Sequence, residues 1–87
     1  MDKAKFRSSQ IWKNKRSEIL ARDHNKCLIC GSCNELQAHH IYSLDSHPQL
    51  RLENNNIITV CSSCHHQIHN AVYSTPYLIN LISKEHE

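Results

Sequence analysis

Apolar residues recur seven and eight positions apart near the start of the chain, a spacing that keeps them on one helix face. This pattern predicts a helix over residues 9–23, with a packed face that carries Ile11, Trp12, Ile19 and Leu20. Ser8 or Ser9 can cap its first turn, because a hydroxyl oxygen accepts a bond from a free backbone N–H. Asn25 suits the left-handed conformation at which such a helix ends.

The rest of the chain alternates between short apolar runs and polar stretches. Strands are predicted over residues 36–41 and 56–61, the second because its Ile, Thr and Val residues are β-branched. Residues 42–55 between them are polar and predict a loop. A helix is predicted over residues 64–73 and another over 76–83. Their apolar residues are Cys64, Ile68, Ala71 and Val72 in the first, and Leu78, Leu81 and Ile82 after Pro76 in the second.

Composition narrows the class of protein. A chain of 87 residues predicts a single domain over residues 1–87 with a small core, and such domains often need a metal or disulfides for stability. Gly31 is the only glycine, which excludes glycine-rich phosphate loops. No apolar run is long enough to span a membrane, and the first ten residues lack the apolar stretch of a secretion signal. We therefore expect a cytoplasmic protein without a membrane partner.

The cysteines form two closely spaced pairs. Cys27 and Cys30 make one CxxC motif, and Cys61 and Cys64 make a second. Two such pairs supply the four thiolates of a tetrahedral Zn²⁺ site, and disulfides are rare in the cytosol. The sequence therefore predicts structural zinc, with Cys33 left over as an alternative ligand to Cys30.

The histidines suggest a second site. His39 and His40 are neighbours near the end of a predicted strand, so their rings should face opposite sides and do different jobs. His65 and His69 lie four residues apart on a predicted helix and share a face that can bind one divalent ion. His66 and His69, three residues apart, could also share a face, so spacing does not choose between these pairs.

Positive charge is concentrated before the first cysteine. Residues 1–26 hold eight of the ten Lys and Arg residues and three of the eight acids, although the formal charge of the whole chain is only +2. This stretch either contacts a polyanion such as DNA or is an ordinary solvated helix surface.

The order of these motifs resembles the HNH, or ββα-metal, endonuclease family. Its pattern is matched by His39-His40, then Asn56 before a strand, then Cys61-x-x-Cys64-His65 and His69. The small zinc-stabilised phage and bacterial members open with features similar to Trp12, Arg22-Asp23 and Cys27-x-x-Cys30-Gly31. The resemblance covers about residues 6–70, with its motif core at about 27–70 and a basic helical segment over 1–26. It implies a small α+β fold, in which a two-stranded antiparallel hairpin is followed by a helix and flanked by an N-terminal and a short C-terminal helix.

The resemblance also implies roles for single residues. His40 matches the general base, while His39, His65 and His69 match ligands of a catalytic Mg²⁺, Mn²⁺ or Ni²⁺ ion. Asn56 matches a residue that either ligates this ion or holds the loop that carries the base.

The implied substrate is DNA, double-stranded in the first instance, cleaved or nicked to leave 5′-phosphate and 3′-hydroxyl ends. Candidate contacts to its backbone are Lys15, Arg16, Arg22 and Arg51. A phage packaging complex or another DNA-processing protein is an expected partner. Two other functions stay open: a non-catalytic, zinc-stabilised nucleic-acid-binding module, and a small adaptor protein.

Overall fold

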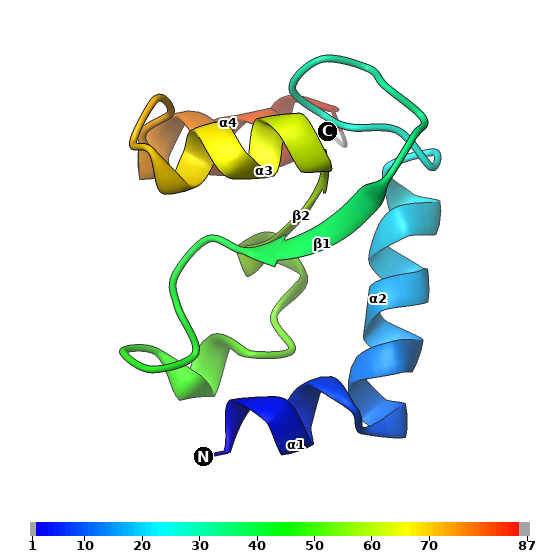
Figure 1. The fold of residues 1–87 in the computed structure, drawn as a ribbon, viewed down its shortest axis with the longest axis vertical. Coiled ribbons are helices and arrows are strands. Elements are labelled where there is room, and N and C mark those ends of the chain that lie inside the picture. Colours follow the sequence, from blue (N-terminus) through cyan, green and yellow to red (C-terminus); the bar gives the residue numbers. More distant parts are fainter. Residues whose placement is uncertain (1, 86–87) are drawn as a thin grey trace.

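The structure, a computed structural model, describes residues 2–85 and has a two-stranded hairpin at its centre (Figure 1). The helix α2 lies beside one side of the hairpin, and α3 and α4 lie on the other. In chain order the elements are α1 (Lys3–Arg7), α2 (Gln10–Arg22), β1 (Leu36–His40), β2 (Ile57–Cys61), α3 (Ser62–His69) and α4 (Thr75–Glu85). This is the predicted small α+β fold. None of its described helices is long and apolar enough to cross a membrane.

The helix α2 begins and ends where the sequence predicts. Ser9 is its N-cap and accepts a hydrogen bond from the backbone N–H of Trp12 at 3.2 Å. Asn25 follows its end in the left-handed region, with φ of 54°. Trp12 and Ile19 are buried, but Ile11 is 62% exposed, so its predicted place on the packed face is wrong. Successive helix residues are about 100° apart, which turns Ile11 away from the face that Trp12 defines.

The basic helical segment over residues 1–26 is divided into two helices, and the apolar pattern that predicts α2 does not predict the short α1. Asp2 caps it, since its carboxylate accepts hydrogen bonds from the N–H groups of Ala4 and Lys5 at 3.1 and 3.3 Å. Five residues are too few to show a helical repeat of apolar positions.

The strands β1 and β2 pair antiparallel, with His39 opposite Ile58 and His40 opposite Ile57. β2 is buried along its whole length, and its side chains alternate between two cores. Ile57 packs with Trp12 and Ile19 of α2, whereas Ile58 and Val60 pack in a second cluster with Leu78 and Ile82 of α4. The segment that joins the strands contains two short 3₁₀ turns, Pro48–Leu50 and Asn54–Asn56.

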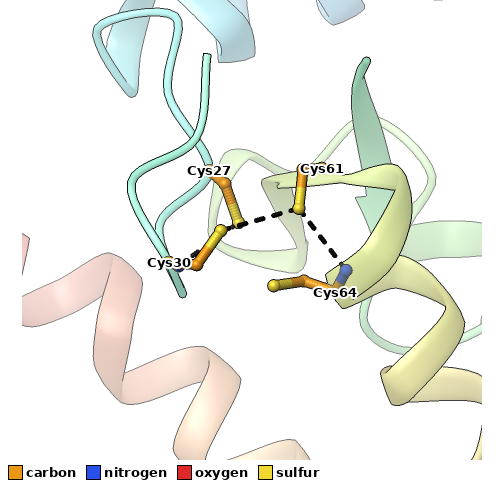
Figure 2. Close-up of side chains that lie close together, drawn as sticks. All are labelled: Cys27, Cys30, Cys61 and Cys64. Carbon is orange, nitrogen blue, oxygen red and sulfur yellow. Dashed lines mark hydrogen bonds between the residues drawn. The ribbon is translucent and has the colours of Figure 1, made fainter. Parts of the chain in front are cut away.

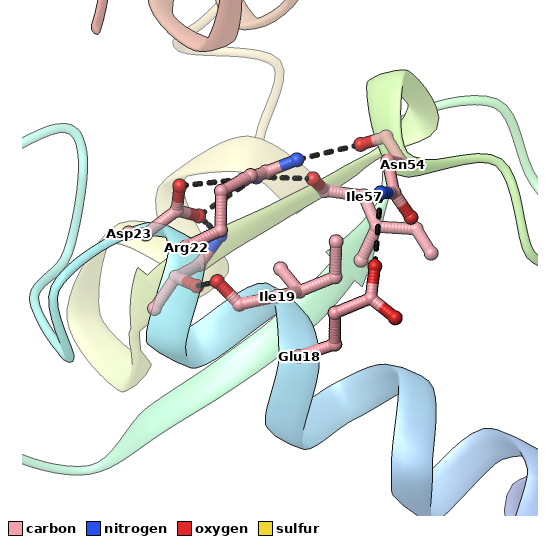
Figure 3. A network of polar contacts seen from close by, with 7 residues as sticks. Glu18, Ile19, Arg22, Asp23, Asn54 and Ile57 are labelled. Carbon is pink, nitrogen blue, oxygen red and sulfur yellow. Dashed lines mark hydrogen bonds and ion pairs between the residues drawn. The ribbon is translucent and has the colours of Figure 1, made fainter. Parts of the chain in front are cut away.

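The outer edge of β2 is hydrogen-bonded by groups from outside the sheet. Arg22 donates to the carbonyl of Ile57 at 2.7 Å. The carboxylate of Asp23 accepts from the N–H of Thr59 at 3.1 Å, and the N–H of Leu28 donates to the Thr59 carbonyl at 3.0 Å. The Arg-Asp pair therefore joins the end of α2 to the central strand (Figure 3).

The helix α3 is displaced from its predicted range of 64–73. It begins directly after Cys61, which is its N-cap, and ends at His69. Ala71 adopts a left-handed φ of 58° and Val72 is 59% exposed, so the predicted apolar edge does not extend past Ile68. α4 starts one residue before Pro76 and buries Leu78 and Ile82 as predicted.

Candidate functional site

Four cysteines from three parts of the chain form a metal-binding cluster (Figure 2). Cys27 and Cys30 lie in the turn before β1, Cys61 ends β2, and Cys64 lies in the first turn of α3. Their four sulfur atoms lie within 4.8 Å of one another, and the Sγ atoms of Cys30 and Cys61 are 3.6 Å apart. Thiolates on one tetrahedral Zn²⁺ ion stand about 3.8 Å apart, given Zn–S bonds of about 2.3 Å. The cluster therefore fits the predicted zinc, and Cys33 lies outside it.

Backbone N–H groups point at two of these sulfurs. The N–H of Cys30 donates to the Sγ of Cys27 at 3.5 Å, and the N–H of Cys64 donates to the Sγ of Cys61 at 3.4 Å. Burial raises the pKa of Cys27, but N–H groups, that of Cys30 foremost, outweigh it and lower this pKa to about 7. The thiolate is the form that binds a metal, so the turn favours metal binding at Cys27.

Three histidines from β1 and α3 lie close together. The ring of His39 lies 5.1 Å from that of His65 and 5.9 Å from that of His69, measured between centroids. The Nε2 atoms of His65 and His69 are 3.2 Å apart. Two nitrogens on one ion stand roughly 3.0–3.4 Å apart, given metal–nitrogen bonds of about 2.0–2.1 Å. The spacing of His65 and His69 therefore suits a shared divalent ion.

Charge also favours a metal at this histidine cluster. Burial, followed by the nearby His65 and His69, lowers the pKa of His39 to about 4. Burial likewise lowers the pKa of His65, and His69 adds to the effect. Neutral imidazole is the form that ligates a metal, so the lowered pKa values of His39 and His65 favour metal binding at these residues.

His40 has a separate environment from its neighbour. Its ring stacks on the indole of Trp12, with centroids 4.8 Å apart and an interplanar angle of 30°. Its Nε2 lies 2.8 Å from the carbonyl of Arg51. Because a carbonyl only accepts, Nε2 carries the hydrogen, and Nδ1 of the neutral ring is left as an acceptor. Burial lowers the pKa of His40, against the opposing effect of the Arg51 carbonyl.

Asn56 is buried and fixes the loop that follows β1. Its Oδ1 accepts from the N–H of Tyr42 at 2.7 Å. Its Nδ2 donates to the carbonyls of Tyr42 and Leu50 at 3.1 and 3.2 Å. Of the two roles that the sequence leaves open, these contacts match the one of holding the loop.

The histidines line one cleft of about 640 Å³. Both His39 and His40 line it from the last two positions of β1. Basic and aromatic side chains from α1 and α2 share the cleft, namely Lys3, Arg7, Trp12 and Arg16. Sequence reasoning did not single out Lys3 or Arg7, although both belong to the basic stretch over residues 1–26.

The four basic residues expected to contact DNA are placed differently. Arg16 lines the cleft and donates to the carbonyl of Leu36 at 3.3 Å. Lys15 bonds Glu18 and Asn54 instead. Arg51 donates from its guanidinium to the carbonyl of Pro48 at 3.0 Å.

Arg22 is the most fully engaged of the four (Figure 3). It makes two bonds of 2.8 Å to the carboxylate of Asp23 and donates at 2.7 Å to the carbonyls of both Asn54 and Ile57. These contacts tie α2 to the segment that leads into β2, and Arg22 is not among the residues that line the cleft.

Comparison with known protein families gives a match. A family model described as HNH endonuclease matches residues 27–71, a range that holds the four clustered cysteines, the cleft histidines and Asn56. The match does not include α1 or α2. Neither curated proteins nor solved structures give a match.

Proposed function

This chain belongs to the HNH endonuclease family, and we propose that it hydrolyses phosphodiester bonds in DNA with His40 as general base and one divalent ion. The observation that carries the proposal is the separation of two neighbouring histidines. His39 packs with His65 and His69, whereas His40 lies apart on Trp12 and Arg51. A hydrolase of this kind needs one group that binds the ion and another that moves a proton.

In the proposed reaction, Nδ1 of His40 takes a proton from a water molecule in the cleft. The water oxygen forms a new bond to phosphorus, and the bond from phosphorus to the 3′ oxygen breaks. The leaving oxygen takes up a proton from solvent, so the products carry a 5′-phosphate and a 3′-hydroxyl. The Arg51 carbonyl keeps the hydrogen on Nε2 throughout, which leaves Nδ1 available.

His39, His65 and His69 would hold the catalytic ion, which when bound stabilises the negative charge that gathers on the phosphate oxygens. Imidazole ligands suit Ni²⁺ better than Mg²⁺, which prefers oxygen. Among Mg²⁺, Mn²⁺ and Ni²⁺, we therefore expect the tightest binding for Ni²⁺. Asn56 acts through the loop over residues 41–50 and does not ligate the ion.

The DNA backbone would lie along the cleft, held by Arg7 and Arg16. Both side chains line the cleft, and guanidinium groups bind phosphate with two parallel hydrogen bonds. Double-stranded DNA is the proposed substrate. Association with a phage packaging complex stays a prediction.

The test is cleavage of supercoiled plasmid in the presence of Mg²⁺, Mn²⁺ or Ni²⁺. The change His40→Ala should lower the rate by about 10²–10⁴ and leave affinity for the ion intact. The change His39→Ala should lower both the rate and the affinity for the ion. The control His47→Ala, in the loop after β1 and outside the cleft, should cleave like the wild type. A wild-type protein that binds zinc and DNA but never cleaves would refute the proposal and favour the non-catalytic binding module.

A further inference from the structure

The indole of Trp12 stacks on His40 but lies outside the family match, which begins at Cys27. Trp12 is 7% exposed, and the face of its indole lies on the imidazole of His40. The ring of Phe6 lies 5.5 Å from Trp12 and 6.2 Å from His40. Two helices that precede the matched region therefore build one wall around this histidine.

Ser9 fixes the two aromatic residues relative to each other. Its hydroxyl donates to the carbonyl of Phe6 at 2.6 Å and accepts from the N–H of Trp12 at 3.2 Å. One side chain thus closes the elbow between α1 and α2. We refer to Phe6, Ser9 and Trp12 together as the aromatic clamp.

We propose that Trp12 is a positioning residue for His40, which the aromatic clamp holds in the orientation that presents Nδ1 to the cleft. The inference rests on the proposed function, because it needs His40 to be the base. The Arg51 carbonyl fixes one atom of the ring, Nε2, about which the imidazole can still tilt. The indole restricts that tilt, because it packs against one face of the imidazole with ring centroids 4.8 Å and planes 30° apart.

The alternative is that Trp12 only fills the core between α2 and β2, where it also packs with Ile19 and Ile57. The two roles differ in what they predict for catalysis. A core residue affects the fraction of folded protein and hence the stability. A positioning residue affects turnover in protein that is fully folded, because a base displaced by about 1 Å can lose roughly 10²-fold in rate.

The first experiment compares Trp12→Phe with Trp12→Leu in zinc-loaded protein, using an oligonucleotide duplex and Mn²⁺ or Ni²⁺. The Phe variant keeps a ring face, and we expect kcat within about threefold of the wild type. The Leu variant keeps apolar bulk without a ring, and kcat should fall roughly 10–100-fold with KM unchanged. The control is Ile11→Ala, an exposed neighbour on α2, which should cleave like the wild type. Equal kcat in the Leu variant and the wild type would overturn the proposal.

The second experiment repeats Trp12→Leu in a protein that already carries His40→Ala. If Trp12 acts through His40, the slow residual rate of the His40→Ala protein should not fall further when Trp12 is changed. A further fall equal to that seen with His40 present would assign Trp12 to the core alone. A matched pair of variants at Ser9, Ser9→Ala and Ser9→Thr, tests the clamp while the indole of Trp12 is kept. The Ala change should lower kcat, and the Thr change, which keeps the hydroxyl, should restore it.

Fluorescence tests the contact without any cleavage assay. Trp12 is the only tryptophan of the chain, so its emission reports this one environment. Replacing His40 by Ala should change the emission, and replacing His47 should not. Unchanged emission in the His40→Ala protein would overturn the stack itself. If the wild type fails to cleave DNA, the proposed function fails; if it cleaves and Trp12→Leu leaves kcat intact, only the positioning role fails.

Discussion

Asn56 and Tyr42 are 14 residues apart in the chain and exchange two opposed hydrogen bonds, one in each direction, at 2.7 and 3.1 Å. The buried amide of Asn56 thereby closes the loop over residues 41–56 at its base. A carboxylate could replace the acceptor of this amide but not the donor.

The change Asn56→Asp should therefore destabilise the protein. It removes both bonds from Nδ2 and sets a negative oxygen against the carbonyls of Tyr42 and Leu50. We expect a loss of about 3 kcal/mol in the free energy of unfolding, measured by urea denaturation with zinc bound. The exposed neighbour supplies the control, since Asn55→Asp should change stability by less than about 0.5 kcal/mol. Equal stabilities for the two variants would contradict the role given to Asn56.

The cysteine cluster should decide whether the chain folds. Structural zinc contributes roughly 10 kcal/mol or more in small zinc domains, as much as the whole stability of a typical domain. We expect Cys61→Ala to bind no zinc and to lack a cooperative thermal transition by circular dichroism. Cys33→Ser should keep one zinc per chain and the wild-type transition. Loss of zinc from the Cys33 variant would mean that the wrong thiolates have been chosen.

His65 and its neighbour His66 offer a matched pair on α3. The ring of His65 faces His39 and His69, whereas His66 is exposed and does not line the cleft. Removal of a direct ligand should weaken Ni²⁺ binding by roughly tenfold or more, because even indirect contacts to metal ligands are worth that much. Titration calorimetry on zinc-loaded protein should show this loss for His65→Ala and none for His66→Ala. The reverse result would move the ion to the other side of the helix.

Arg16 should contribute to DNA binding through its charge. Its guanidinium lines the cleft, so Arg16→Ala should weaken binding to any duplex and reduce the slope of log affinity against log salt by about 1. Lys26→Ala removes the same charge from the turn after α2, outside the cleft. Binding measured by fluorescence anisotropy at several salt concentrations should show a smaller change for Lys26→Ala. Identical slopes for the two variants would indicate that DNA does not enter the cleft.

Features that depend on residues close together in the chain could be predicted from the sequence. Two CxxC pairs predict the cysteine cluster. Each pair already holds two sulfurs close together, so a single contact between the two pairs completes the set of four. The period of two in a strand predicts that His39 and His40 separate. The end of α2 also follows from local chemistry, in which Asn25 tolerates a positive φ.

Other features depend on contacts between distant residues and could not be predicted. Its positive charge makes Arg22 a candidate for contact with DNA, but its partners Asn54 and Ile57 lie 32 and 35 residues away in the chain. The short α1, which brings Arg7 to the cleft, has no periodic signal. The stack of Trp12 on His40 requires the angle between α2 and β1, which no local pattern encodes.

The bonds along the outer edge of β2 have a consequence for encounters between molecules. Unpaired N–H and C=O groups at the side of a sheet recruit strands from other chains and so start aggregation. In a two-stranded hairpin both strands are edge strands. On β2, however, the carbonyl of Ile57 is bonded by Arg22, and the N–H and carbonyl of Thr59 are bonded by Asp23 and Leu28. Along this stretch the sheet cannot be extended by a neighbouring copy unless both the end of α2 and the turn at Leu28 first detach, so the Arg-Asp pair and Leu28 together protect the chain against intermolecular strand pairing.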